Sequence, residues 1–473
     1  MTASLLLGGA ILLAILTVSG VLFSYFSSPR KGVGGIPTIP FWVALTPLVK
    51  DVDQQDIFTK YIENPLRKHG AASIFFAGQW NVLIHKPAYL AEVFRREDIY
   101  QKSGNYSKIP HSVLAALLGD NIISSRGETW KKYKRVIKPG LQASPNLDVL
   151  LRNARQLSTI LVESQALPTD GIQGNIQRHT IACFANTYFN VGPNTPCSSG
   201  ACLHRTQAQV TKEIFTPLFM SFPFLDRLPF PSRTRARRLA SDFTNQLVLT
   251  LEHGAKGGTT SDNHQQNKLC TRLLSARDSG QLTEKQFRDN LTVLFVAGQE
   301  NPQLAILSTM YLLAKHQDMQ DRLFDKLSQQ PGKPPDAEYL DSLPLLTSII
   351  YESDAIFLPE GTYVGYNCYS TNRDPDSWGQ DADAFRPSRW GCSRHDIHRE
   401  YRRRRTRAEF ITFHGGQRAC LGEHFAALQL KATLYTLVTS LRWRLDPTWL
   451  DRMTPGEFLI GWAVVSKKLA LAI

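Results

Sequence analysis

The stretch that most restricts the possible folds of this 473-residue chain is FHGGQRACLG, residues 413–422, which sets one cysteine among small and apolar neighbours. A helical pattern, EHFAALQLKATLYTLVTSL, begins directly after it at Glu423, so Cys420 stands just before a helix N-terminus. The free amides and the dipole of such a terminus favour a thiolate over a thiol. Any fold of this chain must therefore place the Cys420 loop directly at the start of that helix.

Three interpretations of Cys420 compete. A buried structural thiol is the usual role of an isolated cysteine. A catalytic nucleophile would need a positioned base, and His414 and His424 are close in sequence, but that role does not require a glycine-lined loop. A metal ligand explains more of the stretch, because glycines let backbone amides approach the sulfur and Arg418 supplies a cation for an anionic group of a cofactor.

The N-terminal segment predicts a membrane anchor. Residues 5–26 run for about one membrane thickness without a charge, and Arg30 and Lys31 follow. A cleaved signal peptide would carry its basic residues ahead of a shorter apolar run, and a buried core helix is the other alternative. We expect a transmembrane anchor at 4–26, a Pro/Gly-rich hinge at 27–50 and one domain at 51–473, which the positive-inside rule places in the cytosol.

Charge and cysteine content narrow the partners and the compartment. Lys and Arg number 54 against 41 Asp and Glu, a formal net charge of +13, which suits an anionic membrane face, an acidic protein or nucleic acid. The chain shows no nucleic-acid-binding motif, so we expect the first two and no nucleic acid. The seven cysteines are odd in number and include no Cys-x-x-Cys, which argues against a disulfide framework.

The body of the chain is mostly helical in pattern, without internal repeats. An early strand-like stretch, ASIFFAGQWNVLIH at 72–85, predicts a hairpin around Gly78. A helix LPLLTSIIYESD, residues 343–354, is expected to bury its apolar face and carry Glu352 in its last turn.

One long helix is expected to cross the protein interior. It begins at Thr283, which forms a capping box with Gln286, and continues through a stretch that is apolar on nearly all sides. Its middle contains Gly298, a poor helix former, Glu300, an acid at core depth, and Pro302, which removes a backbone donor. We expect the helix to break locally there, which either only strains it or opens a groove for something bound against it.

The cysteine stretch resembles a known family. Phe413, Gly416, Arg418, Cys420 and Gly422 match Phe-x-x-Gly-x-Arg-x-Cys-x-Gly, the haem-thiolate signature of the cytochrome P-450 family. The resemblance implies a mainly α (α+β) fold with small β-sheets, preceded by one N-terminal transmembrane helix. It also implies haem b, with Cys420 as the axial thiolate ligand of the iron and the other four residues binding the cofactor.

The long helix resembles the helix that crosses the distal face of the haem in that family. The resemblance implies that Ala297 and Gly298 contact the cofactor and that Glu300 and Asn301 form the catalytic pair, with Glu300 relaying protons. Asn301 stands where threonine is commoner. Its amide cannot pass a proton as a hydroxyl does, but it can hold a water or bound oxygen.

Two further segments extend the resemblance. WKKYKR, residues 130–135, is similar to the family helix whose Trp and basic residue, here Trp130 and Lys134, reach the haem propionates. FRPSRW, residues 385–390, resembles the segment that contributes an arginine, here Arg389, to a structural Glu-Arg-Arg triad whose acid is Glu352.

The resemblance implies an activity and its partners. Family members activate dioxygen reductively and insert one oxygen atom into an organic substrate, with electrons from an NADPH-cytochrome P-450 reductase. The expected contact regions, 103–122 and 215–230, are apolar and aromatic and imply a hydrophobic substrate. The anchor is similar to that of microsomal members, which implies a single-pass protein of the endoplasmic reticulum membrane. The sequence around Cys420 is similar to that of fungal members, including the dityrosine-forming type, and this similarity suggests a role in fungal secondary metabolism.

A run of basic residues, Arg402 to Arg405 with Arg407, precedes the cysteine loop. Such a run is usually a solvated surface. If it lies on the proximal face of the haem, it would steer an acidic reductase by charge complementarity, and both interpretations stay open.

The chain departs from the family pattern after Glu352. The family has Glu-x-x-Arg there, but this chain has Ala355 at the arginine position. The sequence continues as IIYESDAIFLPEGT, so a segment that family members contain is missing between about residues 354 and 359. An unpaired buried partner costs about 3–5 kcal/mol. Either the functional protein contains a coding segment absent here, which the clean junction favours, or this is a truncated, non-catalytic remnant with weak or absent haem binding.

Overall fold

The structure is a computed structural model that describes residues 17, 20, 35–49, 53–164, 172–191, 201–256, 268–328, 335–353, 364–445 and 471–472. Among these residues no helix has the length and apolar character needed to cross a membrane. Apart from Thr17 and Gly20, the expected anchor at 4–26 lies outside the described residues, as does the junction at about 354–359.

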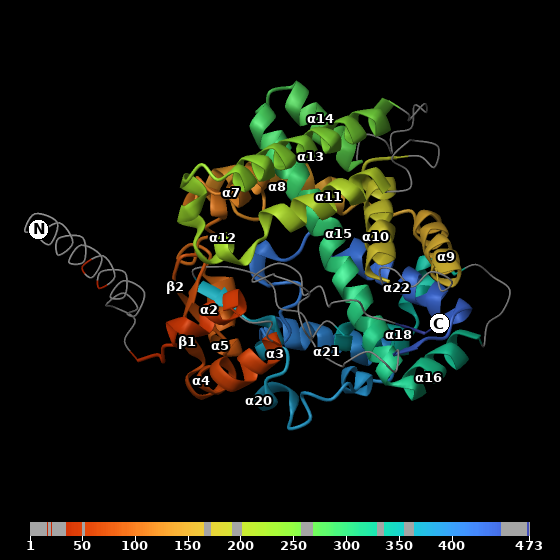
Figure 1. The fold of residues 1–473 in the computed structure, drawn as a ribbon. Helices are drawn as coiled ribbons and strands as arrows, with labels where there is room; N and C mark the ends of the chain where they lie inside the picture. Colours follow the sequence, from red (N-terminus) through yellow and green to blue (C-terminus); the bar gives the residue numbers. More distant parts are fainter. Residues whose placement is uncertain are drawn as a thin grey trace, which may run out of the picture.

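A small β-sheet and short helices form one side of the molecule, at the left of Figure 1. Strands β1 (Ala71–Phe76) and β2 (Gln79–Ile84) are antiparallel and joined by Ala77 and Gly78, both at positive φ, so the predicted hairpin is confirmed. Strand β3 (Val364–Tyr366) adds in parallel to β2 from far along the chain. The helices beside the sheet are α2 (Phe41–Val49), α3 (Gln54–Ile57), the π-helical turn η1 (Phe58–Ile62), α4 (Glu63–His69) and α5 (Pro87–Arg95).

The rest of the described chain is mainly helical, as the sequence predicts. Up to the junction it contains α6 (Asn105–Lys108), α7 (Val113–Leu118), α8 (Gly127–Leu141), α9 (Leu147–Ser164), α10 (Gln173–Tyr188), α11 (Ala201–Ile214), α12 (Pro217–Ser221), η2 (Pro223–Arg227), α13 (Pro231–Lys256), α14 (Leu269–Asp278), α15 (Glu284–Lys315), α16 (Gln317–Ser328), α17 (Ala337–Asp341) and α18 (Pro344–Ser353). After the junction it contains α19 (Cys368–Thr371), α20 (Pro375–Trp378), η5 (Pro387–Trp390), α21 (Arg394–Thr406), η6 (Gly416–Arg418), α22 (Glu423–Ser440) and a two-stranded pair, β4 (Arg444–Leu445) with β5 (Leu471–Ala472).

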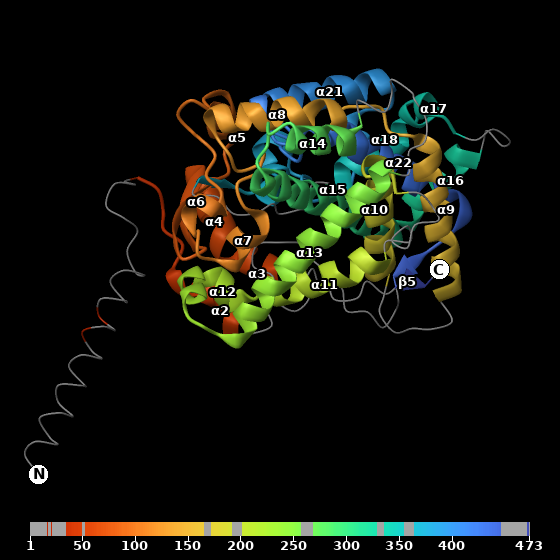
Figure 2. The same ribbon diagram turned by 90° about the horizontal axis from the view of Figure 1, so that it is seen from above.

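Helix α15 is the long helix expected to cross the interior. Both views show it passing through the middle of the molecule, with α10 and α13 packed against it (Figures 1 and 2). The Thr283–Gln286 capping box is present at its start. The expected break is absent, because α15 continues without interruption through Gly298 and Pro302. The chain stays helical at Pro302 because a proline removes one donor but leaves the neighbouring turns bonded, and Pro302 itself is buried in the packed protein.

Gly298 has a packing role that the sequence did not indicate. A Cβ built on it would lie 2.1 Å from a ring carbon of Phe184 on α10. Phe184 also makes an edge-on contact with Phe295, one turn earlier in α15. The glycine therefore lets α10 approach α15 closely, rather than opening a groove between them.

Candidate functional site

The cysteine loop is fixed by two residues at positive φ and by a return hydrogen bond. Gly416 has φ 64°, and a Cβ there would lie 2.2 Å from the carbonyl oxygen of Phe94, so this position requires glycine. His414 has φ 60°. The amide of Cys420 donates to the carbonyl of Phe413 at 3.0 Å, which closes the loop just ahead of α22.

The thiol of Cys420 is accessible although protein atoms surround it. Its side chain is exposed, yet burial is the largest influence on the group and raises the pKa of the thiol. The residue therefore keeps accessible surface while protein atoms enclose most of the space around its sulfur. Backbone N–H groups of Gly422 and Glu423 hydrogen-bond to the sulfur and oppose the rise in its pKa, because they stabilise the thiolate. Gly422 is the N-cap of α22, as expected from the sequence.

Arg418, Trp130 and Lys134, predicted from separate segments, lie together. The indole of Trp130 is between two cations, with the Arg418 guanidinium 4.0 Å and the Lys134 ammonium 4.4 Å from its ring centroid. Arg418 also donates to the carbonyl of Ser125 at 2.9 Å and approaches Glu97 at 3.6 Å. The first turns of α8 and the cysteine loop are therefore joined by cation–π contacts.

Lys102 adds a further cation to this cluster. Its ammonium lies 3.0 Å from Nε2 of His414, and burial, with repulsion from Arg418, lowers the pKa of Lys102 to about 8. The pKa of His414 falls to about 3, through burial first and then the charge of Lys102. His414 is therefore neutral and accepts a hydrogen bond from Lys102. Two part-buried cations, Lys102 and Arg418, thus share one nearby carboxylate, Glu97.

The middle of α15 carries the other group of predicted residues. Ala297, Gly298 and Glu300 keep some accessible surface and Asn301 is exposed, whereas the preceding two turns of the helix are buried. Ala297 and Asn301 are one turn apart and so share a face. The amide nitrogen of Asn301 donates to the carbonyl of Ala297 at 3.4 Å, which ties the side chain to its own helix.

Glu300 is a part-buried acid whose carboxyl group is enclosed by protein and has an amide partner. Burial raises the pKa of its carboxyl to about 7, opposed by one hydrogen bond from Nε2 of Gln207 at 3.1 Å. The charge of a group with this pKa changes near neutral pH, as a proton relay requires.

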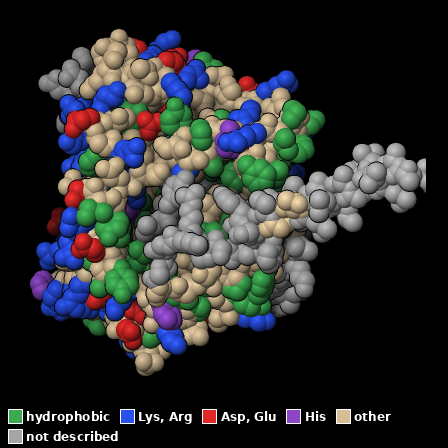
Figure 3. All heavy atoms as spheres, turned by 90° about the vertical axis from the view of Figure 1, so that its left-hand side faces the viewer, with side chains coloured by type: hydrophobic (Ala, Val, Ile, Leu, Met, Phe, Trp, Pro, Cys, Tyr) green, Lys and Arg blue, Asp and Glu red, His purple; other side chains and the backbone are tan. Residues whose placement is uncertain are grey.

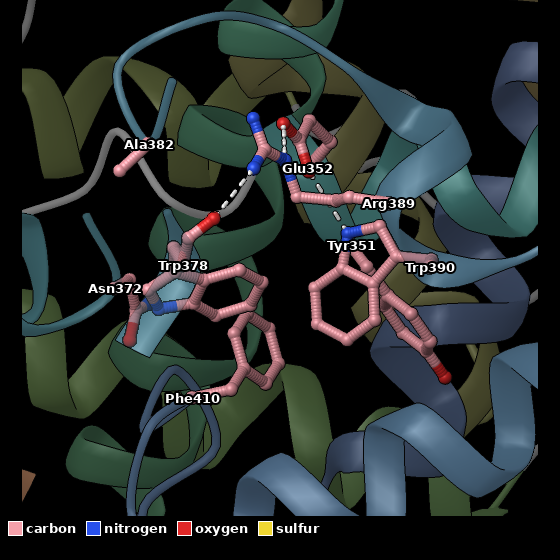
Figure 4. Close-up of a pocket in the computed structure, with 8 residues that line it drawn as sticks. All are labelled: Tyr351, Glu352, Asn372, Trp378, Ala382, Arg389, Trp390 and Phe410. Carbon is pink, nitrogen blue, oxygen red and sulfur yellow. Dashed lines mark hydrogen bonds and ion pairs between the residues drawn. The ribbon is translucent and has the colours of Figure 1, made fainter. Parts of the chain in front are cut away.

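Glu352, the acid left without its family arginine, is fully hydrogen-bonded. Its Oε1 accepts from Nε of Arg389 at 2.8 Å and from the backbone N–H of Arg386 at 2.9 Å, while its Oε2 accepts from the indole of Trp390 at 3.0 Å (Figure 4). Arg389 in turn donates to the carbonyls of Trp378, Asp381 and Ala384. Glu352 is therefore not left unpaired, because Arg389 is its charged partner.

A small cavity lies beside the Glu352–Arg389 pair. It measures about 10 Å³ and is lined by residues from α18, α20, η5 and the loop before the cysteine stretch, including Tyr351, Trp378 and Phe410 (Figure 4). That is roughly the space for one water molecule. The aromatic side chains of Trp378, Trp390, Tyr401 and Phe410 close around the place.

Most of the arginine run is not a free charged surface. Arg404 is buried, stacks on Trp378 with its guanidinium 3.8 Å from the ring centroid and pairs with Glu409 at 3.3 Å. Arg403 pairs with Glu400 at 2.8 Å, and Arg405 pairs with Glu423 at 2.9 Å. The interpretation as a wholly solvated run is therefore wrong for Arg404, which helps to hold α21 in place.

Comparison with known proteins supports one family. The sequence profile of the family described as Cytochrome P-450 matches residues 36–353 and 354–469. The chain is 34% identical to Cytochrome P-450-DIT2 of Saccharomyces cerevisiae over 94% of this chain and 95% of that protein. It is 33% identical to Cytochrome P-450 monooxygenase xanG of Aspergillus fumigatus, over 90% and 85%.

The chain belongs to the cytochrome P-450 family. The fold agrees: the crystal structure of the heme domain of a cytochrome P-450DA mutant superimposes with a TM-score of 0.66, at 16% identity, over 93% of this chain and 97% of that one. By family the chain is an oxidoreductase of the monooxygenase type, and the family uses haem with a cysteine thiolate as axial ligand.

The residues present fit a haem. A thiol with accessible surface and two amides hydrogen-bonded to its sulfur suits an iron-bound thiolate. Two part-buried cations with one carboxylate between them suit the carboxylates of a P-450 cofactor, which would balance the excess charge. Phe413 and Gly416 shape the loop without contributing a charged group.

Sequence reasoning missed Lys102, Gln207 and Trp390. Lys102 and Trp390 carry no local signal, because their partners His414 and Glu352 are distant in sequence or on another element. Gln207 lies on α11 and reaches α15 across 93 positions. Gln207 is a polar residue on an otherwise apolar helix face, which suggests a buried partner. The sequence does not show that this partner is Glu300.

Proposed function

We propose that this chain is a membrane-anchored haem-thiolate monooxygenase that inserts one oxygen atom of dioxygen into a hydrophobic organic substrate, with Cys420 as the axial ligand. The observation that carries the proposal is the Cys420 thiol, which is exposed, hydrogen-bonded by two amides and placed on the same loop as Arg418. A structural thiol would not need that access, and a nucleophile would need a base. His414 is occupied by Lys102.

Haem bound through a thiolate supplies the activation of dioxygen. The residues of this chain hold it and manage protons. The α22 N-terminus and the amides of Gly422 and Glu423 would stabilise the Cys420 thiolate against the effect of burial, while Lys102, Arg418 and Lys134, with Trp130, would hold the cofactor carboxylates. Glu300 holds or releases a proton near pH 7, and the Asn301 amide positions a water or oxygen.

The proposal is tested by the spectrum of the reduced, carbon monoxide-bound protein. A red-shifted, thiolate-type Soret band is expected for the chain as given and is expected to be lost in Cys420→Ser. Cys392→Ser is the matched control, because Cys392 is also an exposed free cysteine but lies outside the loop. A thiolate-type band that persists in Cys420→Ser would overturn the assignment of the ligand.

We further propose that Glu300 and Asn301 are the catalytic pair. Glu300→Gln is expected to slow turnover more than it weakens substrate binding, because the amide occupies the same space but cannot relay a proton. Equal turnover in the variant would exclude the relay.

Membrane attachment at the endoplasmic reticulum, through one N-terminal span, belongs to the same proposal. Exposed apolar side chains on α12, η2 and the following turn support it, together with Trp42 on the adjacent helix α2. They are Leu218, Phe224, Leu228 and Phe230. Figure 3 faces this side of the molecule, and hydrophobic side chains gather on it among Lys and Arg. Release of the protein into the supernatant of carbonate-washed microsomes would contradict the span.

An NADPH-cytochrome P-450 reductase is the proposed electron donor. Of the arginine run, Arg402 and Arg407 remain exposed, and Arg407 has only a distant partner, Glu409 at 3.7 Å. We expect the affinity for the reductase to fall with ionic strength, and Arg402→Ala with Arg407→Ala to flatten that dependence. Affinity that ignores salt would remove these arginines from the docking surface. We also propose a role in fungal secondary metabolism, and the fungal origin of both relatives supports the fungal part of that proposal.

A second candidate is a non-catalytic remnant with weak or absent haem binding. Two observations favour it: no arginine follows Glu352 at the third position, and the family profile is matched in two stretches that meet between Ser353 and Asp354. The same junction supports the alternative that a coding segment of a functional protein is absent here. A transcript read across the Glu352 codon separates the two, because an uninterrupted message with this junction defeats the missing-segment explanation.

A further inference from the structure

The family resemblance assigns no role to Gln207, but its position beside Glu300 suggests one. It lies on α11, is only 1% exposed, and its amide reaches across to α15, where Nε2 donates to Oε1 of Glu300 at 3.1 Å. Within the part of the chain that the structure describes, its own Oε1 is buried without a hydrogen-bond partner. An unused buried acceptor costs free energy, and this one belongs to the amide that already contacts Glu300, so a change at Glu300 could bring it into use.

The surroundings of Glu300 give the amide that role. Burial and the bond from Gln207 are the two influences on the pKa of Glu300, and no charged side chain on α10, α11, α13 or α22, within the described residues, contributes. His204, also on α11, is affected by burial and by Arg178 rather than by Glu300. A carboxyl without a cation spends comparable time protonated and ionised near neutral pH, and its neighbour must tolerate both forms.

An amide can bond to either form, whereas a lysine, an arginine or an apolar side chain suits only one. When Glu300 is ionised, Nε2 of Gln207 donates to the carboxylate, as seen here. When Glu300 takes up a proton from water, its new O–H can donate to Oε1 of Gln207 after the amide turns over by about 180°.

We propose that Gln207 is a positioning residue that holds Glu300 in place and keeps both of its protonation states accessible, by turning its amide as the carboxyl gains or loses a proton. The proposal rests on the proposed function of Glu300 as the distal proton relay. It differs from that function in naming what sets the charge state of the acid, and it assigns Gln207 no contact with substrate or cofactor.

The test follows the protonation of Glu300 directly. Infrared difference spectra of the purified full chain, recorded against pH, report the carbonyl stretch of the protonated carboxyl, and its absence in Glu300→Gln assigns the band. Gln207→Leu removes the donor at nearly the same volume, so the midpoint is expected to move upward from about 7 by about 1 pH unit. Gln207→Glu adds a second acid and is expected to move it further.

Two outcomes are decisive. An unchanged midpoint in Gln207→Leu overturns the proposal, and if that variant does not fold, Gln207→Met, which also lacks the amide at a similar size, gives the same decision by the presence or absence of an upward shift. Turnover of the haem-loaded variants against pH separates this proposal from the relay itself. A shifted midpoint with turnover that does not depend on Glu300 keeps the coupling and removes the relay, whereas a shifted alkaline limb in Gln207→Leu supports both.

Discussion

Two regions of this molecule hold charge inside the protein, and they are balanced differently. At the Glu352 site one acid receives three hydrogen bonds from Arg389, Arg386 and Trp390, and the arginine spends its remaining donors on backbone carbonyls. At the cysteine loop, Lys102 and Arg418 share one carboxylate. The first region is complete within the chain, and the second has a positive charge left over for a ligand to balance.

The difference teaches that the lost Glu-x-x-Arg arginine matters less to the fold than the sequence suggests. The expected penalty assumed that Glu352 would lack partners, but the indole of Trp390 bonds to its second oxygen and the backbone amide of Arg386 uses a remaining lone pair of the first. Contacts among the described residues therefore hold the aromatic cluster around Trp390 without that arginine.

Breaking the balanced region should have the largest effect. Arg389→Ala removes the only cation paired with Glu352 among the described residues and is expected to lower the free energy of unfolding by about 3–5 kcal/mol, measured in urea. Arg386→Ala is the matched control, since Arg386 serves Glu352 through its backbone and its side chain pairs only at the surface with Asp381. That control should change stability by less than about 1 kcal/mol. Similar losses in both variants would mean that the pair is not what holds this region.

Glu300 extends the comparison to a buried acid with only a neutral partner. Its pKa in the folded protein is raised to about 7 from 4.5, so the native state binds the proton more tightly than the unfolded state. Stability should therefore be highest below pH 4.5 as far as this group is concerned, and fall as pH rises to about 7. Glu300→Gln removes this loss, and its stability relative to the parent should increase by about 2–3 kcal/mol between pH 5 and pH 8. A constant difference across that range would show that Glu300 titrates normally.

Local pattern predicted the elements of this fold, and long-range contact decided how the site is balanced. The 72–85 hairpin, the Thr283 capping box and the helix that begins at Glu423 each depend on neighbours within a few positions, and all three are confirmed. The sequence also indicated that Trp130, Lys134 and Arg418 belong to one site, but only through resemblance.

What the sequence could not supply were partners contributed by other elements. Lys102 meets His414 across 312 positions, and Gln207 meets Glu300 across 93. The expected break in α15 failed for the same reason, because Phe184 of another helix fills the space beside Gly298. Propensity describes a helix alone, and tertiary packing overrides it.

Removing a charge from the unbalanced region should have the opposite sign to Arg389→Ala. Lys102→Met takes away a part-buried cation that Arg418 repels, so the haem-free protein is expected to gain about 1–2 kcal/mol while its affinity for haem falls. Lys131→Met, at an exposed lysine paired only with Glu128, should leave both unchanged. Loss of stability in Lys102→Met without a change in haem affinity would place Lys102 among the structural residues and remove the contrast between the two regions.

The glycines of the cysteine loop give the smallest and most selective test. A Cβ at Gly422 would meet nothing within 4 Å, and its φ of −92° suits any residue, so Gly422→Ala should change the free energy of unfolding of the haem-free protein by less than about 0.5 kcal/mol. At Gly416 the positive φ and the Phe94 carbonyl at 2.2 Å forbid the same change without strain. If glycine at 422 serves the cofactor rather than the fold, Gly422→Ala will still weaken haem binding, because the added methyl stands beside the amide that bonds to the Cys420 sulfur. Unaltered haem affinity in Gly422→Ala would show that glycine at this position is required neither for the fold nor for haem binding.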